Sequence, residues 1–187
     1  VVFGGHLIDR PDRASPRFPP PIEPAVRDAI RERLRPLDAG LGYASAGCGG
    51  DILFLECLQE LNVEAHIVLP YDREQFKGDS VDIMPGADWA ARYERQLASA
   101  KEVITASEQR MAEGGMSYEY GFLMLDGTAG VRADELDTDL VCLALRTEHR
   151  CIAPDLRGHG DSEWSPTLDY RLETHATDVE ALVRHLR

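Results

Sequence analysis

The chain has 187 residues, of which 43% are hydrophobic and 28% are charged, and its formal net charge is −13. This length suits one domain, or one domain with a fragment of another. The negative charge disfavours nucleic acids and anionic membranes as partners, because both require basic surfaces. No apolar run approaches the roughly 18 residues that a membrane span needs, so the composition is typical of a globular, soluble protein.

Four cysteines occur without C-x-x-C spacing, at positions 48, 57, 142 and 151. We find no secretory apolar segment, so we expect reduced thiols and a cytoplasmic location rather than a disulfide framework. The sequence predicts neither a metal site nor a cofactor. It begins Val-Val without a Met, which suggests an excised piece or an incomplete reading frame.

The first part of the chain alternates short apolar runs with helical patterns. Residues 1–8 (VVFGGHLI) are typical of a buried strand that opens into a loop. The proline-rich residues 10–24 predict an irregular connection, and Pro24 suits the first turn of the next helix. That helix places four apolar side chains on one stripe: Val26, Ile30, Leu34 and Leu37.

The pattern then repeats through the rest of the chain. Strands are predicted at 41–47, 64–70, 102–105 and 140–145. Helices are predicted from Gly47 to Leu61, from a cap at Asp88, and from a cap at Ser117, with loops at 71–86 and in the acidic residues 126–139. Strands that alternate with helices predict an α/β fold, a Rossmann-like three-layer structure with a mostly parallel sheet.

This alternation breaks near residues 145–148. The apolar runs 140–145 and 150–155 are separated by too few residues for a parallel crossover, which needs roughly a dozen. The two runs could form a hairpin, one could be no strand, or two unrelated segments could be joined here. We therefore expect a ligand-binding domain at 1–145 and a separate segment at 146–187. A gene fusion, a frameshift and an assembly artefact all remain open as the origin of the join.

Candidate ligand-binding residues lie where predicted strands end, because ligands of parallel sheets bind beyond the carboxyl ends of the strands. They are Gly4, Gly5, His6, Gly47, Gly49, Gly50 and Asp51. A carboxylate in the first turn of a helix repels an anion, so Asp51 suits a ribose hydroxyl better than a phosphate. The alternative is structural: the glycines satisfy the turns, and His6 is a hydrogen-bonded loop residue.

Glu119 is the candidate catalytic residue. The stretch SYEYGF (117–122) resembles the place where nucleoside deoxyribosyltransferase-like and TIR-like proteins keep a catalytic glutamate, and the alternative is a helix-capping charge. More broadly, FGGHLIDRPDR, GYASAGCGGDILFLE, HIVLPYDREQF and WAARYERQLASA resemble a Rossmann-like signalling region found beside tetratricopeptide and nucleotide-cyclase modules in bacteria. The resemblance implies a nucleotide- or nucleoside-type ligand and partner domains outside this chain. It leaves open whether the domain senses this ligand or cleaves its N-glycosidic bond.

Residues 146–187 carry a second resemblance. RCIAPDLRGHGDSEW, followed by DYRLETHATDVEALVRHL, resembles the strand, exit loop and helix that precede the nucleophile of an α/β-hydrolase. The chain contains no G-x-S-x-G: Ser45 in YASAG lacks the first glycine, and Ser162 lies in the exit loop. His159, Asp161 and Ser162 are too close in sequence to form a catalytic relay. The alternative function is therefore an esterase-like fragment that is inactive as given.

Overall fold

The structure, a computed structural model, describes residues 1–111 and 115–145 and, near the C-terminus, residues 174, 177, 178, 181, 182 and 184. The chain divides into two compact units, Val1–His149 and Arg150–Arg187. In the second unit the described residues are helical, and the predicted strand at 150–155 lies outside the described residues. The domain boundary at 145–146 stays a prediction. All elements named below belong to the first unit.

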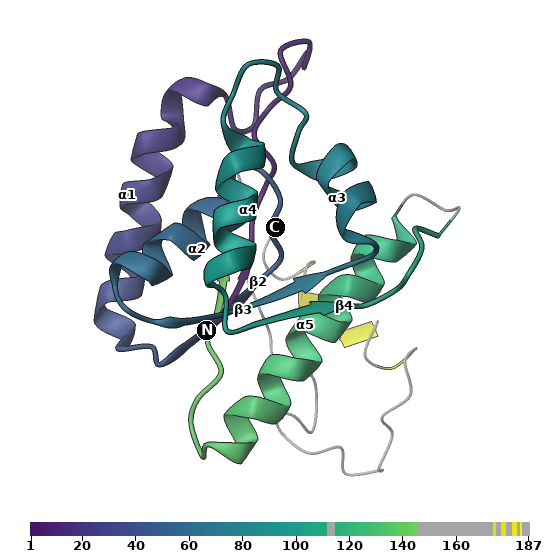
Figure 1. The fold of residues 1–187 in the computed structure, drawn as a ribbon. Helices are drawn as coiled ribbons and strands as arrows, with labels where there is room; N and C mark the ends of the chain where they lie inside the picture. Colours follow the sequence, from purple (N-terminus) through teal and green to yellow (C-terminus); the bar gives the residue numbers. More distant parts are fainter. Residues whose placement is uncertain (112–114, 146–173, 175–176, 179–180, 183, 185–187) are drawn as a thin grey trace. The chain divides into compact units, whose positions relative to one another are not determined.

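Five parallel strands form one sheet in the order β4-β3-β2-β1-β5, which confirms the predicted α/β fold (Figure 1). Their bounds are Val2–Gly4 (β1), Leu41–Ala44 (β2), Glu64–Leu69 (β3), Glu102–Thr105 (β4) and Cys142–Ala144 (β5). The chain steps outward from β1 to β4 and then returns across the sheet to place β5 on the other side of β1. The strand predicted at 140–145 is thus β5, which pairs in parallel with β1.

The reversal of direction decides which face each helix covers, since crossovers between parallel strands are right-handed. The helices are α1 (Glu23–Leu34), α2 (Gly50–Glu60), α3 (Arg73–Ser80), α4 (Trp89–Ser99) and α5 (Met116–Glu135), with single turns η1 (Pro20–Ile22) and η2 (Arg35–Leu37). The connections from β1 to β4 use α1 to α4, and α2 packs against α1, α4 and three strands. The return connection carries α5, which packs against β1, β2 and β3 from the opposite face.

The two faces of the sheet bury cores of different size. The larger core joins the sheet to α1, α2 and α4 and includes Phe3, whose ring stacks on Phe54 with centroids 4.6 Å apart. The smaller core lies under α5 and contains Val2, Tyr43, Val68, Leu125 and Ala129. One 20-residue helix thus covers the second face.

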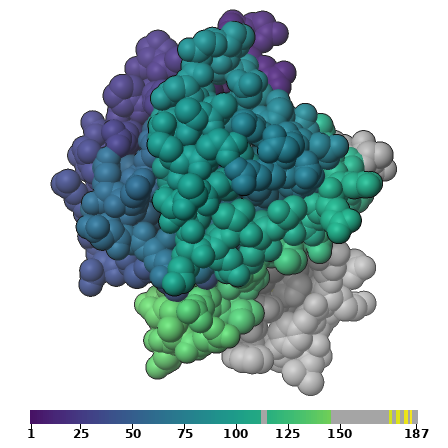
Figure 2. Space-filling view, viewed as in Figure 1, coloured from purple at the N-terminus to yellow at the C-terminus, as the bar shows by residue number. Residues whose placement is uncertain are grey.

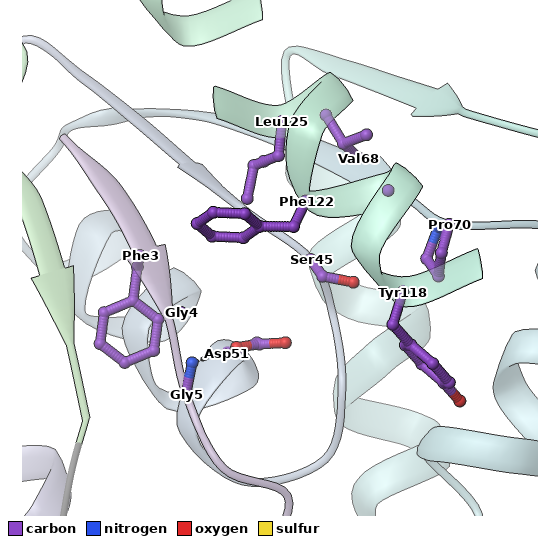
Figure 3. A pocket seen from close by; sticks show the side chains of 11 residues that line it. Phe3, Gly4, Gly5, Ser45, Asp51, Val68, Pro70, Tyr118, Phe122 and Leu125 are labelled. Atoms are coloured by element: carbon purple, nitrogen blue, oxygen red, sulfur yellow. Dashed lines mark hydrogen bonds between the residues drawn. The ribbon is translucent and has the colours of Figure 1, made fainter. Parts of the chain in front are cut away.

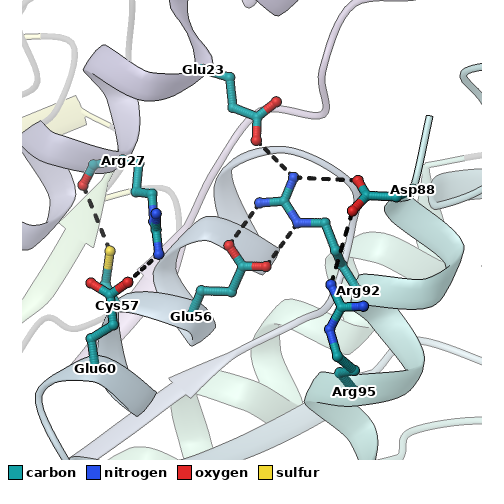
Figure 4. A network of polar contacts seen from close by, with 8 residues as sticks. All are labelled: Glu23, Arg27, Glu56, Cys57, Glu60, Asp88, Arg92 and Arg95. Carbon is teal, nitrogen blue, oxygen red and sulfur yellow. Dashed lines mark hydrogen bonds and ion pairs between the residues drawn. The ribbon is translucent and has the colours of Figure 1, made fainter.

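Buried Arg92 links three helices of the larger layer (Figure 4). Its guanidinium donates two hydrogen bonds of 2.7 Å to Glu56 of α2 and one of 2.7 Å to Glu23 of α1. It also lies 4.0 Å from the ring centroid of Trp89. A buried guanidinium needs such partners because desolvating an unpaired charge is costly.

Three local predictions were wrong. The predicted loop 71–86 contains α3, because Asp72 caps it by accepting hydrogen bonds from the N–H groups of Glu74 and Gln75. The acidic residues 126–135 continue α5, since Leu125, Ala129 and Ala133 pack inward at four-residue spacing. Ser117 lies inside α5 instead of capping it, and its hydroxyl accepts a hydrogen bond from Met111 N–H.

None of the helices in the described residues is both long enough and apolar enough to cross a membrane.

Candidate functional site

A cavity of about 150 Å³ lies at the carboxyl ends of β1, β2 and β3, against the first turns of α5 (Figure 3). Residues from five segments line it: Phe3, Gly4, Gly5, Ser45, Asp51, Val68, Pro70, Tyr118, Gly121, Phe122 and Leu125. Its position follows from the fold, because loops that leave parallel strands at one edge converge there. Aromatic and apolar groups make up most of the wall.

Asp51 supplies the carboxyl group of this cavity from the first turn of α2. Oδ1 accepts a hydrogen bond from Gly5 N–H, and Oδ2 accepts one from Gly47 N–H, both at 3.2 Å. Burial raises the pKa of Asp51 to about 7, against the opposing effect of these two N–H donors. Near neutral pH the group is therefore present in both protonation states. The carboxylate can accept a hydrogen bond from a ligand, and the protonated form can donate one to it.

The glycine-rich turn between β2 and α2 directs its N–H groups to the protein itself. Gly47 N–H donates to Asp51, Cys48 N–H to the Ser80 carbonyl, and Gly50 N–H to the His6 carbonyl. Gly49 has φ +109°, and a Cβ there would lie 2.6 Å from the Ile8 nitrogen. These glycines allow the loop after β1 to touch the start of α2. The N–H groups of Gly47, Cys48 and Gly50 are thus occupied within the protein, which disfavours this turn as a phosphate cradle.

Ser45, directly after β2, contributes an unpaired hydroxyl. Its Oγ is buried and has no hydrogen-bond partner among the described residues. Figure 3 shows the Ser45 and Asp51 side chains pointing toward the same space. A buried hydroxyl without a partner costs free energy, so a polar ligand atom that bonds to it is stabilising.

The wall formed by α5 is held in place by a chain of hydroxyl groups. Tyr118 OH shares hydrogen bonds with Tyr71 OH at 2.8 Å and with Ser80 Oγ at 2.9 Å. Tyr71 in turn donates to Asp79 at 3.1 Å, and burial raises the pKa of Tyr71. Gly121 lies so close to Pro70 that a Cβ would meet the proline Cβ at 2.7 Å. The first turn of α5 is therefore held against Tyr71, Ser80 and Pro70.

The structure brings some of the predicted site residues together. Gly4, Gly5 and Asp51 line the cavity, and Gly47 is hydrogen-bonded to Asp51. Gly49 and Gly50 support the turn without lining the cavity, and His6 lines a different cavity. Glu119 is exposed on α5 and is not among the residues that line the site. The roles proposed for these residues stay predictions.

The sequence alone does not identify Ser45, Tyr118 and Phe122 as residues that line the cavity at Asp51. The predicted strand 41–47 includes Ser45, whereas β2 ends at Ala44 and leaves Ser45 at the carboxyl end of the strand, where ligands of parallel sheets bind. Tyr118 and Phe122 flank Glu119 and Gly121 on a helix, and one face of that helix meets the sheet. Among the described residues, no group of three or more His, Cys, Asp or Glu side chains could hold a metal ion.

Comparison with protein-family models matches residues 122–187 to the alpha/beta hydrolase fold. The match begins inside α5, includes β5 and continues through the segment that holds RCIAPDLRGHGDSEW. It covers well under half of the chain and supports the resemblance of the C-terminal segment to α/β-hydrolases. A search of the curated proteins found no match. The chain is thus an α/β protein with a parallel, Rossmann-like sheet and a C-terminal part similar to the hydrolase fold.

Proposed function

We propose that the cavity at Asp51 binds the sugar ring of a nucleoside-type ligand. The observation that carries this proposal is the pairing of the Asp51 carboxyl group with the unpaired Ser45 hydroxyl in one cavity. A carboxyl group beside a hydroxyl can bond to neighbouring hydroxyls of a pentose. The aromatic rings of Phe122 and Tyr118 would cover the apolar face of the ligand.

The size of the cavity favours one ring. A cavity of about 150 Å³ holds a benzene-sized group, whereas sites that enclose whole drug-sized ligands span about 300 to 1,000 Å³. The sugar would occupy the cavity at Asp51, and the base would lie outside it, toward solvent. A phosphate at this position is disfavoured, because Asp51 already takes the N–H groups of Gly5 and Gly47.

Binding without cleavage agrees best with the position of the carboxylates. Asp51 is the only carboxylate among the described residues that line the cavity, and Glu119 is exposed elsewhere on α5. Asp51 is assigned here to the sugar hydroxyls, and both of its oxygens accept backbone N–H bonds, so cleavage of an N-glycosidic bond would require a further carboxylate at the anomeric carbon. We therefore favour a ligand sensor in a bacterial signalling protein, whose partner domains lie outside this chain.

Calorimetric titration of the full chain with adenosine, ribose and adenosine monophosphate tests this proposal. We expect adenosine and ribose to bind, with the monophosphate no tighter than adenosine. Asp51→Asn and Ser45→Ala should each weaken adenosine binding by about tenfold, the effect of about 1.4 kcal/mol. Asp82→Asn, an exposed substitution with the same change of charge, should leave affinity unchanged. Equal binding by all three variants, or no binding by the wild type, would contradict the proposal.

The family-model match favours a second candidate function, an esterase-like fragment. The sequence contains no G-x-S-x-G, so we expect no nucleophilic serine and no ester hydrolysis above background. A fluorophosphonate that labels active-site serines is the direct test. A covalent adduct on any serine of this chain would show that a hydrolase site is present.

A further inference from the structure

A second cavity, of about 410 Å³, lies in the loop that follows β1. It is lined by residues 6–10, Asp12, Arg13, Arg17 and Ile83, and so includes three arginines. Figure 2 shows the loop, in purple, projecting at the top of the view. It does not share a lining residue with the cavity at Asp51.

The base of this loop is closed by hydrogen bonds. The Asp9 carboxylate accepts bonds from the N–H groups of Arg17 at 2.7 Å and Phe18 at 2.8 Å. Asp9 N–H donates to the Phe18 carbonyl at 2.8 Å, and the Phe18 side chain is fully buried. Ile8 N–H donates to the Cys48 carbonyl at 2.9 Å. The backbone that carries the arginines is therefore anchored to the core at both ends.

Two of the three guanidinium groups have no carboxylate partner among the residues that the structure describes. Arg13 forms an ion pair with Asp9 at 3.3 Å, but Arg10 and Arg17 form no ion pair with any described residue. Arg33 and Arg35 likewise form no ion pair with a described residue, so Arg10 and Arg17 are distinguished by lining one cavity together. Asp9 and Asp12 offset part of the positive charge and leave these two guanidinium groups available.

We infer that this cavity binds the phosphate group of a small phosphorylated molecule. Guanidinium groups bind phosphate through two parallel hydrogen bonds, and His6 adds a further polar group on the same wall. The cavity volume lies within the range of about 300 to 1,000 Å³ that is typical of small-molecule sites. The inference is independent of the proposed sugar site, because different residues form the two cavities.

Calorimetric titration of the full chain with inorganic pyrophosphate, and separately with phosphate, at low ionic strength tests the inference. We expect pyrophosphate to bind more tightly than phosphate, and binding to weaken as salt rises, because ions screen exposed charges. The doubly substituted Arg10→Gln, Arg17→Gln chain should bind pyrophosphate at least about tenfold more weakly. Both side chains are exposed, and the substitutions leave the Arg17 N–H bond to Asp9 intact.

Arg33→Gln is the matched control, since Arg33 is an exposed arginine of α1 away from the cavity. It should not change pyrophosphate affinity. Arg10→Lys with Arg17→Lys should retain part of the affinity, because charge remains while the bidentate geometry is lost. The inference fails if the wild-type chain shows no binding with up to about 10 mM pyrophosphate. A dissociation constant above that concentration would be weaker than that of ordinary metabolite sites. It also fails if Arg33→Gln weakens binding as much as the double substitution.

Discussion

The carboxyl group of Asp51, in the first turn of α2, accepts a hydrogen bond from the backbone N–H of Gly5, 3.2 Å away in the loop after β1. A second bond from Gly47 N–H makes the same side chain a bridge between two strand exits. Asp51 thus connects the loops that follow β1 and β2, and its carboxyl group also lines the cavity. Because of these two roles, we expect the protonation state of Asp51 to affect both the free energy of unfolding and the affinity for a ligand.

The first prediction concerns the pH dependence of stability. Burial raises the pKa of Asp51 from 3.8 to about 7, so between these values the folded chain holds a proton that the unfolded chain has released. The free energy of unfolding that this group contributes therefore falls as pH rises through this window, and is constant above it. Asp51→Asn removes this dependence.

Urea denaturation at about pH 5 and about pH 8 measures this effect. The wild type should lose about 1 to 3 kcal/mol more stability between the two pH values than Asp51→Asn does. Asp82→Asn, an exposed carboxylate, should keep the wild-type pH dependence. If the wild type and Asp51→Asn show parallel pH profiles, the carboxyl group does not titrate as the structure indicates.

The second prediction compares two glycines of α5. Gly121 faces Pro70, and an added Cβ would lie 2.8 Å from the proline Cα, whereas Gly127 has no atom within 4 Å of that position. Gly121→Ala should destabilise the chain by about 1 to 3 kcal/mol through overpacking. Gly127→Ala should stabilise it by about 0.5 to 1 kcal/mol, because alanine loses less conformational freedom in a helix. Thermal unfolding of the two variants should therefore shift in opposite directions.

Much of this arrangement followed from the sequence, because parallel sheets leave periodic signals. Buried strands read as continuous apolar runs, and glycines with Asp51 mark the turn between β2 and α2. The carboxyl ends of such strands meet at one edge, which is why Gly4, Gly5 and Asp51 line the same cavity. These predictions needed only local pattern and a general rule of topology.

The remaining features depend on packing between distant segments. The acidic composition of residues 126–135 predicted a loop, but Ala129 and Ala133 fit against the sheet and extend α5. The unpaired state of Ser45 Oγ depends on which groups surround it in space. The same holds for Arg10 and Arg17, which line one cavity although the sequence predicts only an irregular, proline-rich connection there.

The third prediction separates sensing from cleavage. Glu119 is exposed on α5 and does not line the cavity, so Glu119→Gln should leave adenosine affinity unchanged. Incubation of the wild type with NAD or nucleosides, followed by chromatography, should release no free base. Release of base that disappears in Glu119→Gln would instead establish this glutamate as catalytic and would overturn the sensor proposal.

The last prediction concerns the Arg92 network in Figure 4. Arg92 is 8% exposed and bonds to Glu56 and Glu23, so Arg92→Ala leaves two carboxylates of neighbouring helices without their shared partner. We expect a loss of about 2 to 4 kcal/mol in the free energy of unfolding, because removing one member of a buried ion pair leaves the charge of the other buried without a partner. Arg95→Ala is the control, since Arg95 is 60% exposed and lies 4.0 Å from Asp88. That exposed pair should contribute less than about 0.5 kcal/mol. Urea denaturation of both variants compares the two values directly, and similar losses would mean that Arg92 acts as a surface residue.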